Sequence, residues 1–437
     1  MAALFWGGMA SLVGRSASAA SNDAATQAAA PPPAEPGTLD VPAPPPPHSG
    51  LSSWFNPATA PFIPIPSIGV DPNSGTTLGI LPVWVETDDE HQIRRIIAPD
   101  VLYNPYFGVA VHGRLYVYPS ADEQWSLVAG IEERVERQFD GEFTTGRLRE
   151  TRWSINASLI FDRDGTPRFY GIGNESPTTA ETNYTNEQEL AQVQVGFNLT
   201  HAWQLQYTLR EEVVDVQPGT LARIASIDTR FSHTLGVGTN DEALNRLSII
   251  HDTRNDLTVP TEGSEWVIYG GVASRTGIFN DSMNSEAGVD GRVFWPIAPQ
   301  TILAVHTALR YLPSAHAVPF WALSSLGGDN SVIGGEQPLR GFGEGRYYDR
   351  DSFSTNVELR RTVASFNAIS THVDMELTPF VDVGRVFSNP GTFPLDQLHH
   401  VFGVGFRGIA RPFVVGYVDI GYGSEGLAAF TGLNYPF

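Results

Sequence analysis

The chain has 437 residues, of which 41% are hydrophobic, a formal net charge of −21 and no cysteine. The acidic balance argues against nucleic-acid binding, since phosphate contacts need clusters of Lys and Arg, and the missing cysteines exclude disulfides and thiolate metal sites. No apolar run approaches the roughly eighteen residues of a membrane-spanning helix, which leaves soluble domains or one large β-barrel, whose strands escape that test.

The N-terminal residues predict export followed by a spacer. "AALFWGGMASLVG" is a short apolar core, and "SASAA" (Ser16–Ala20) offers small residues for cleavage. Residues 1–20 are therefore predicted to be a signal peptide that lacks its usual positive start; the alternative is a disordered Ala-rich leader. Residues 21–61 include a Pro-rich stretch that cannot build a core, and we predict a disordered, extended periplasmic segment there.

From about Phe62 onward, apolar and polar residues alternate with a period of two. In "TILAVHTALRY", Leu303 and Val305 fall on one face, while His306 and Arg310 fall on the other. Either a half-buried strand of a soluble protein or a lipid-facing strand of a barrel has this pattern. Sixteen candidate strands follow: 75–86, 92–103, 107–119, 124–137, 150–162, 188–200, 202–216, 244–252, 264–275, 284–296, 299–312, 353–363, 374–387, 399–410, 412–422 and 427–437.

The length and spacing of these strands favour the barrel. Several reach the roughly 9–11 residues that cross a bilayer at a tilt, whereas soluble strands average about five or six. Short connections such as "NPY" and "IAP" alternate with long ones at 163–187, 217–243 and 313–352. We therefore predict a transmembrane antiparallel β-barrel of 16 strands at residues 62–437. It would lie in the outer membrane of a Gram-negative cell, in contact with its lipids, with both termini on the short-turn, periplasmic side.

The last predicted strand ends in aromatic residues. "AAFTGLNYPF" places Leu433, Tyr435 and Phe437 on one face. This pattern resembles the C-terminal signal by which outer-membrane barrels are recognised for assembly. A soluble protein could end this way by chance, but the preceding alternation favours the barrel interpretation.

The connection at 313–352 is too long for a plain turn, which predicts either a functional or a disordered loop. Its "LRGF" (Leu339–Phe342) resembles the Arg-Gly-Phe/Tyr motif of the bacterial surface antigen family, the BamA/TamA outer-membrane assembly barrels. "DTRNDLTVPTEG" upstream, and "NVELRR" and "FVDVGRVF" downstream, are similar to other segments of that family in the same order. The resemblance implies a sixteen-stranded barrel whose long loop folds back into the lumen.

The same resemblance implies a lumen latch. Arg340 would pair with Glu358 and Asp382, and the alternation of their strands places both acids on the lumen side. A guanidinium can bridge two carboxylates through charge-assisted hydrogen bonds. Gly341 would permit a sharp turn, and Phe342 would wedge against the wall. The alternative is an ordinary surface loop with exposed arginines.

Other motifs carry little chemistry. "GVGFRG" (Gly403–Gly408) is followed by a strand pattern, and not by the helix that a dinucleotide site needs. No histidine spacing predicts a metal site, and no Gly-x-Ser-x-Gly elbow is present. We therefore expect neither a cofactor nor enzymatic activity. The alternative is an outer-membrane enzyme with Ser and His on the barrel wall. Asp252, Arg254 and Asp256 are interpreted as solvated turn residues at the barrel rim.

The leading functional hypothesis is a relative of the assembly barrels without their periplasmic POTRA domains, because the Pro-rich segment is too short to form one. It would help unfolded outer-membrane or secreted proteins to insert or translocate at a weak seam between the first and last strands. In the first candidate strand, Gly79 and Pro82 would weaken pairing. The alternatives are a porin-like channel, a structural barrel without clients, or a secretion pore for one passenger.

Overall fold

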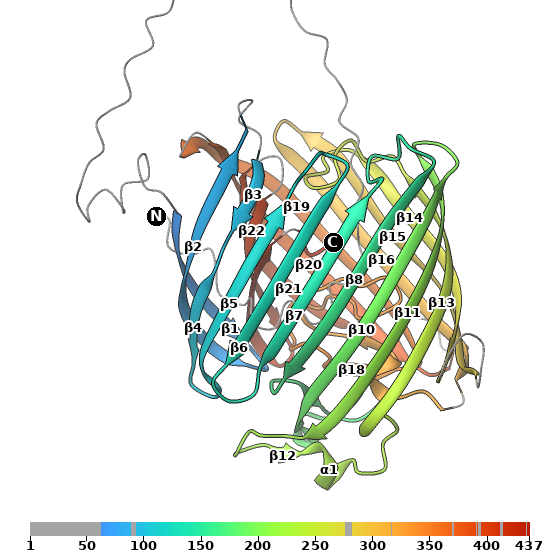
Figure 1. Cartoon of the computed structure of the whole chain (residues 1–437). Helices are drawn as coiled ribbons and strands as arrows, with labels where there is room; N and C mark the ends of the chain where they lie inside the picture. The colour runs from blue at the N-terminus through green and yellow to red at the C-terminus, as the bar shows by residue number, and fades with distance from the viewer. Residues whose placement is uncertain are drawn as a thin grey trace, which may run out of the picture.

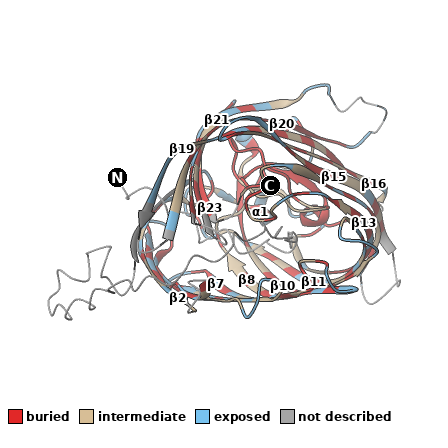
Figure 2. Cartoon of the chain, turned by 90° about the horizontal axis from the view of Figure 1, so that it is seen from above, coloured by how far each residue is buried: buried red, intermediate tan, exposed pale blue. Residues whose placement is uncertain are grey.

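The computed structural model describes residues 63–88, 93–275, 282–315, 317–368, 371–389, 391, 395–410, 414–433 and 435–437. The predicted signal peptide and the Pro-rich segment lie outside the described residues. Long tilted strands surround a lumen (Figures 1 and 2). None of the helices in the described part of the chain is long and apolar enough to cross a membrane.

The elements follow one another around the ring. In the first half of the wall they are β1 (Ile63–Asp71), β2 (Gly75–Thr87), β3 (Ile93–Ile97), β4 (Asp100–Asn104), β5 (Gly108–Val117), β6 (Gln124–Glu132), β7 (Arg137–Thr145), β8 (Trp153–Asp164) and β10 (Thr182–Asn198). In the second half they are β11 (Trp203–Pro218), β13 (Gly238–Asp252), β14 (Gly263–Ser274), β15 (Ser282–Ala298), β16 (Thr301–Ala315), β19 (Asp351–Ala368), β20 (Thr371–Phe387), β21 (His399–Ala410), β22 (Val414–Gly423) and β23 (Gly426–Leu433). The connections contain β9 (Arg168–Phe169), η2 (Thr178–Ala180), β12 (Ala225–Ser226), α1 (Ile227–Arg230), η3 (Phe320–Ala322), β17 (Ser324–Leu326) and β18 (Tyr347–Asp349).

Neighbouring wall strands are antiparallel, and β23 pairs with β1 to close the sheet. In the described residues the wall has eighteen strands, because β3 and β4 both lie between β2 and β5 and count as one. The predicted count of sixteen is not confirmed. The sequence-based prediction did not include two strands of the wall. They are β1, where two prolines hide the alternation, and β7, whose acidic side chains made it resemble a loop.

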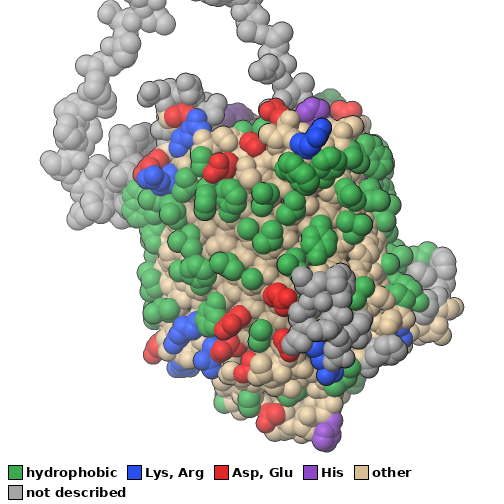
Figure 3. Space-filling view, turned by 45° about the vertical axis from the view of Figure 1, so that its right-hand side comes forward, with side chains coloured by type: hydrophobic (Ala, Val, Ile, Leu, Met, Phe, Trp, Pro, Cys, Tyr) green, Lys and Arg blue, Asp and Glu red, His purple; other side chains and the backbone are tan. Residues whose placement is uncertain are grey.

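The wall has an apolar outer face and a polar inner face. Large apolar side chains such as Ile131 and Phe402 are about 60% exposed, whereas polar ones such as Gln192 and Arg407 are buried toward the lumen. On the face that Figure 3 shows, hydrophobic side chains form a band across the middle of the wall, and most charged ones lie toward its two ends. This inversion of the usual burial is that of a barrel whose outer face meets lipid.

The two ends of the barrel differ. At one, called here the loop end, lie the long connections 165–181, 219–237 and 316–350; at the other, the terminal end, β1 begins and β23 ends. β12 and α1 project beyond the wall at the loop end (Figure 1). There the three connections and the adjoining wall strands pack an apolar cap from Phe169, Tyr184, Val214, Val216, Ile227, Leu312, Val318, Phe320, Trp321, Ala322, Leu323 and Tyr348. The cap covers the lumen from that side.

Candidate functional site

The loop 316–350 folds back into the lumen and forms a tight turn at its deepest point. The backbone N–H groups of Gly341 and Phe342 both donate to the carbonyl of Leu339, at 2.8 and 3.0 Å. The turn directs the side chain of Arg340 to the wall, where its exposed fraction is 0%. A fully buried guanidinium is stable only when carboxylates satisfy it.

Arg340 binds carboxylates from three wall strands. Its Nε and Nη2 donate to the two oxygens of Asp382 on β20, at 2.9 and 2.7 Å. Its Nη1 donates to Glu358 on β19 at 2.6 Å and to Asp419 on β22 at 2.7 Å. The guanidinium also lies 3.6 Å from the ring centroid of Phe380. Burial alone would lower the pKa of Arg340, but the three carboxylates raise it well above its ordinary value.

Two wall arginines extend this arrangement. Arg407 on β21 donates to Glu358 at 2.7 Å, and Arg360 on β19 donates to the other oxygen of Glu358 at 2.8 Å. Both arginines are almost fully buried. We call the set the lumen charge cluster; its members are Arg340, Glu358, Arg360, Glu376, Asp382, Arg407 and Asp419. Through this cluster, Arg340 of the loop is linked to four adjacent strands of the wall, β19, β20, β21 and β22.

The residues after Arg340 pack closely against the same wall. A Cβ atom on Gly341 would lie 2.7 Å from the backbone nitrogen of Gly423, so only glycine fits this approach to β22. Phe342 is 1% exposed and lies in an apolar cluster with Leu326, Leu339, Tyr347, Phe380, Val386 and Val401. The turn is therefore fastened by charge at one residue and by apolar packing two residues later.

The seam between the first and last strands is the weakest junction in the described wall. β1 and β23 share one registered pair, Val70 with Ala429. By contrast, β1 forms nine pairs with β2, and β23 forms eight with β22. Most backbone groups on the facing edges of β1 and β23 therefore lack a strand partner across the seam, which makes these edges available to another strand.

Comparison with known proteins identifies the family. A model described as the Omp85 superfamily domain matches residues 123–407. The chain belongs to the Omp85 superfamily. A comparison with curated proteins gives no match.

Solved structures show the same fold at low sequence identity. BamA from Haemophilus ducreyi, lacking POTRA domains 1–3, is 13% identical with a TM-score of 0.50, over 81% of this chain and 75% of that one. CdiB from Escherichia coli is 10% identical with a TM-score of 0.51, over 84% of this chain and 62% of that one. The resemblance to BamA/TamA-type barrels and the transmembrane β-barrel fold are thereby confirmed for this Omp85 barrel.

The predicted latch residues lie together in the lumen. Arg340 contacts both Glu358 and Asp382, with Gly341 and Phe342 against the adjoining wall, although their role as a latch stays a prediction. Sequence reasoning missed the partners Arg360, Glu376, Arg407 and Asp419. Their strands were predicted, and a check for charged residues on the lumen face of each would have found them.

The aromatic residues after β23 do not continue the wall. The predicted strand 427–437 ends at Leu433 in the structure, and Tyr435 and Phe437 lie in the lumen. Figure 2 shows the C-terminus inside the ring. The ring of Phe437 stacks on His306 with centroids 5.1 Å apart, and Arg360 lies 3.8 Å from the ring of Tyr435. The two rings therefore pack on lumen side chains, and the proposed role of these residues as an assembly signal concerns the chain before it folds.

The connection after β13 also turns inward, which corrects the prediction of a solvated rim. Arg254 is buried and donates to both oxygens of Asp252, at 3.0 and 2.7 Å, and to Glu265 at 3.0 Å. Val259 packs on Ile409 and Tyr435 inside the barrel. Sequence periodicity could not show this, because the partners lie on other strands.

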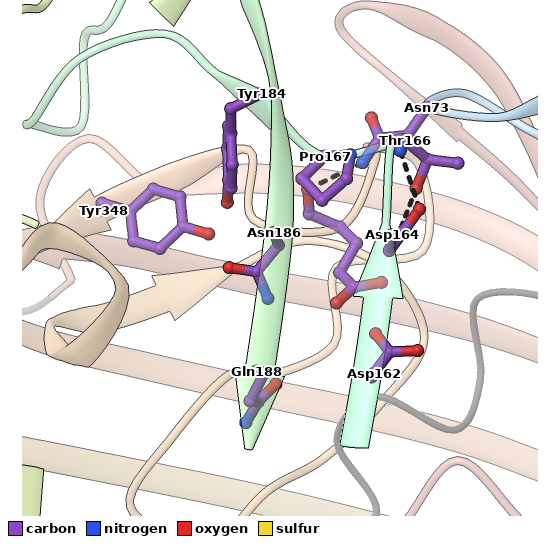
Figure 4. Close-up of a pocket in the computed structure, with 10 residues that line it drawn as sticks. Asn73, Asp162, Asp164, Thr166, Pro167, Tyr184, Asn186, Gln188 and Tyr348 are labelled. Carbon is purple, nitrogen blue, oxygen red and sulfur yellow. Dashed lines mark hydrogen bonds between the residues drawn. The ribbon is translucent and has the colours of Figure 1, made fainter. Parts of the chain in front are cut away.

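A small polar recess, partly open to solvent, lies between the lumen loop and the wall near the loop end (Figure 4). Asp164, which accepts two hydrogen bonds from Thr166, and Glu344 of the loop are among the residues that line it. Among the described residues, no three His, Asp or Glu side chains are arranged to hold a metal ion. The recess therefore gives no indication of a metal centre.

The turn between β6 and β7 contains a buried carboxyl group, that of Glu136, which should make the stability of the folded chain depend on pH. Burial, followed by the negative charge of Asp164, raises the pKa of the Glu136 carboxyl from 4.5 to about 8. The folded chain therefore binds this proton more tightly than the unfolded chain, and the resulting stability is full below pH 4.5 and is lost as the pH rises through about 8. The charged or titratable groups around it are Asp100, His112, Arg114, Glu132 and Asp164.

We expect the melting temperature to fall as the pH rises from about 4.5 to about 8, and to fall less in Glu136→Gln. Thermal unfolding followed by heat-modifiability on gels checks this. Glu133→Gln is the matched control, because Glu133 lies in the same turn and is exposed. Equal pH slopes in native protein and Glu136→Gln would contradict the assignment.

Proposed function

We propose that this Omp85 barrel assists the insertion or translocation of unfolded outer-membrane or secreted proteins through the seam between β1 and β23. The observation that carries the proposal is the single registered pair, Val70 with Ala429, that joins these strands. An unpaired strand edge offers backbone donors and acceptors to an incoming strand. The site acts by templating strand pairing, and no catalytic group is required.

The lengths of the wall strands support the same location. At the seam, β23 has eight residues, β1 nine and β22 ten. Farther around the ring, β10 has seventeen and β19 eighteen. A short apolar wall thins the surrounding bilayer, and a thinner bilayer lowers the cost of inserting a strand beside it. The weakly paired seam therefore lies in the part of the described wall that has the shorter strands, which also includes β6 and β7 with nine residues each.

The filled lumen argues against the porin-like alternative. The loop 316–350 and the apolar cap occupy the interior, and Arg340 fastens the loop to β19, β20 and β22. An open pore would require the buried guanidinium to leave its carboxylates. We further propose that the loop end faces the exterior and that the terminal end, with both termini, faces the periplasm.

A switchable seam tests the proposal in one protein. The chain has no cysteine, so Val70→Cys with Ala429→Cys places the only two thiols opposite each other. In proteoliposomes, the reduced protein should accelerate the folding of an unfolded outer-membrane barrel, measured by its protease protection. Oxidation should abolish most of that acceleration, because the disulfide closes the seam. Native protein under the same oxidant controls for effects on the client and the lipids.

Two outcomes would reject the proposal: no acceleration by the reduced protein, or equal acceleration after oxidation. Ion conductance through the same vesicles separates the alternatives. Steady conductance without client folding would support a channel, and the absence of both activities would support a structural barrel.

A further inference from the structure

A second arginine of the lumen loop is fastened to the last hairpin of the wall. Arg346 follows Gly345, whose φ of +62° turns the chain and whose N–H donates to Glu336 at 2.6 Å. The Nε of Arg346 donates to both carboxylate oxygens of Glu425, at 2.8 and 3.0 Å, and its Nη2 lies 2.6 Å from one of them. Only 3% of the arginine side chain is exposed, against 25% for the glutamate.

The rest of the guanidinium is held by a different connection. Nη1 donates to the hydroxyl of Ser176 at 2.9 Å, and Nη2 donates to the carbonyl of the same residue at 2.8 Å. The rings of Tyr170 and Tyr347 lie on the cation, at 4.0 and 4.4 Å. Arg346 is therefore fixed by the loop end of the barrel whether or not Glu425 binds it, so the arginine serves as a preformed anchor point for the hairpin.

Glu425 occupies a position that matters for the seam. It lies in the two-residue turn between β22 and β23, immediately before Gly426, where β23 begins. The far edge of β23 has one registered pair with β1, so that edge contributes little to holding the strand. At the loop end, β23 is restrained by its ladder with β22 and by the contacts of Glu425 in the turn, which are the ion pair with Arg346 and a hydrogen bond with the side chain of Tyr347.

We propose that Arg346 is a positioning residue that closes the seam from inside the barrel by holding Glu425. Its effect is distinct from that of Arg340, because the guanidinium of Arg340 donates to wall strands β19, β20 and β22, whereas that of Arg346 donates to the turn itself. A partly buried, charge-assisted pair of this geometry restrains the hairpin; without it, β23 separates more often from the loop and from β1. Only the link from seam opening to client insertion rests on the function proposed above.

Hydrogen exchange of the β23 backbone amides measures the restraint directly, because exchange reports the fraction of time that a segment is open. In the full chain in lipid nanodiscs, Arg346→Gln and Glu425→Gln should each raise the exchange rate over Gly426–Leu433 by about tenfold. The double variant should exchange no faster than the faster single variant, since one interaction is lost in all three. Amides of β19 and β20 report whether the barrel stays intact.

Arg350→Gln is the matched control. Arg350 belongs to the same loop, but its guanidinium donates to the carbonyl of Leu312 at 2.7 Å and not to the last hairpin. Its exchange over β23 should equal that of the native protein. Unchanged β23 exchange in both Arg346→Gln and Glu425→Gln would overturn the proposal, as would effects that add in the double variant. Should Arg346→Gln fail to fold, Glu425→Gln decides by comparison with Tyr347→Phe, which removes the other hydrogen bond of Glu425 and leaves its ion pair with Arg346.

Client folding in proteoliposomes is measured separately on the same variants. If exchange rises over β23, the restraint by Arg346 is established whatever the insertion rate. If insertion then stays unchanged, the function proposed for the seam fails while the ion pair keeps its positioning role. The two failures are thus distinguishable.

Discussion

Replacing Arg340 with alanine is expected to lower the free energy of unfolding by about 3–5 kcal/mol, the usual cost of removing one partner from a buried ion pair. The loss is large because Glu358, Asp382 and Asp419 would then share the lumen with fewer counter-charges. Urea unfolding in detergent micelles, followed by tryptophan fluorescence and by heat-modifiability, measures it. Loop 316–350 should also become sensitive to protease while the barrel remains folded.

Two further variants separate the possible causes. Arg340→Lys keeps the charge but cannot reproduce the bidentate contact with Asp382, so we expect it to recover only part of the loss. Arg350→Ala removes an arginine from the same loop that binds backbone carbonyls, and it should cost much less. If Arg340→Ala and Arg350→Ala had equal effects, the lumen charge cluster would not be what holds the loop.

Gly421→Ala is expected to displace the turn at Arg340 from the wall. A Cβ atom at this β22 position would overlap the backbone carbonyl of Arg340, and a backbone atom cannot move aside as the end of a side chain can. Overpacking of this kind typically costs about 1–3 kcal/mol. The loss of the short contact between Arg340 and Asp419 would add to that cost. Protease sensitivity of the loop and urea unfolding both measure the change.

Gly113→Ala provides the comparison for that variant. Gly113 is also a wall glycine, but the nearest atom to an added Cβ would be the carbonyl oxygen of Ala129, at 4.0 Å. This substitution should leave loop sensitivity and stability close to native values. A Gly421→Ala protein with native protease resistance would show that the loop tolerates displacement from β22.

A β-barrel can be predicted from the sequence because its signal is local. Alternation in stretches such as Thr301–Ala315 reports which side chains meet lipid and which meet the lumen, and that pattern does not depend on the partner strands. The same reasoning placed Glu358 and Asp382 on the inner face before any contact was known. It failed at β1, where two prolines mask the alternation, and at β7, where Gly141 interrupts the apolar outer face between Phe139 and Phe143.

The pairing of charges in the lumen and the way the wall closes depend on contacts between residues far apart in the chain. The closure of the ring brings Asp419 to Arg340 beside two other acids, and it brings Arg346 to Glu425. It also allows Tyr435 to leave the wall for the lumen. The eighteen strands of the described wall, and the seam joined by one registered pair, likewise depend on closure. Periodicity along one segment determines which face a residue occupies. Only the tertiary structure determines which charges meet across the lumen, since their pairing depends on the register and tilt of every strand between them.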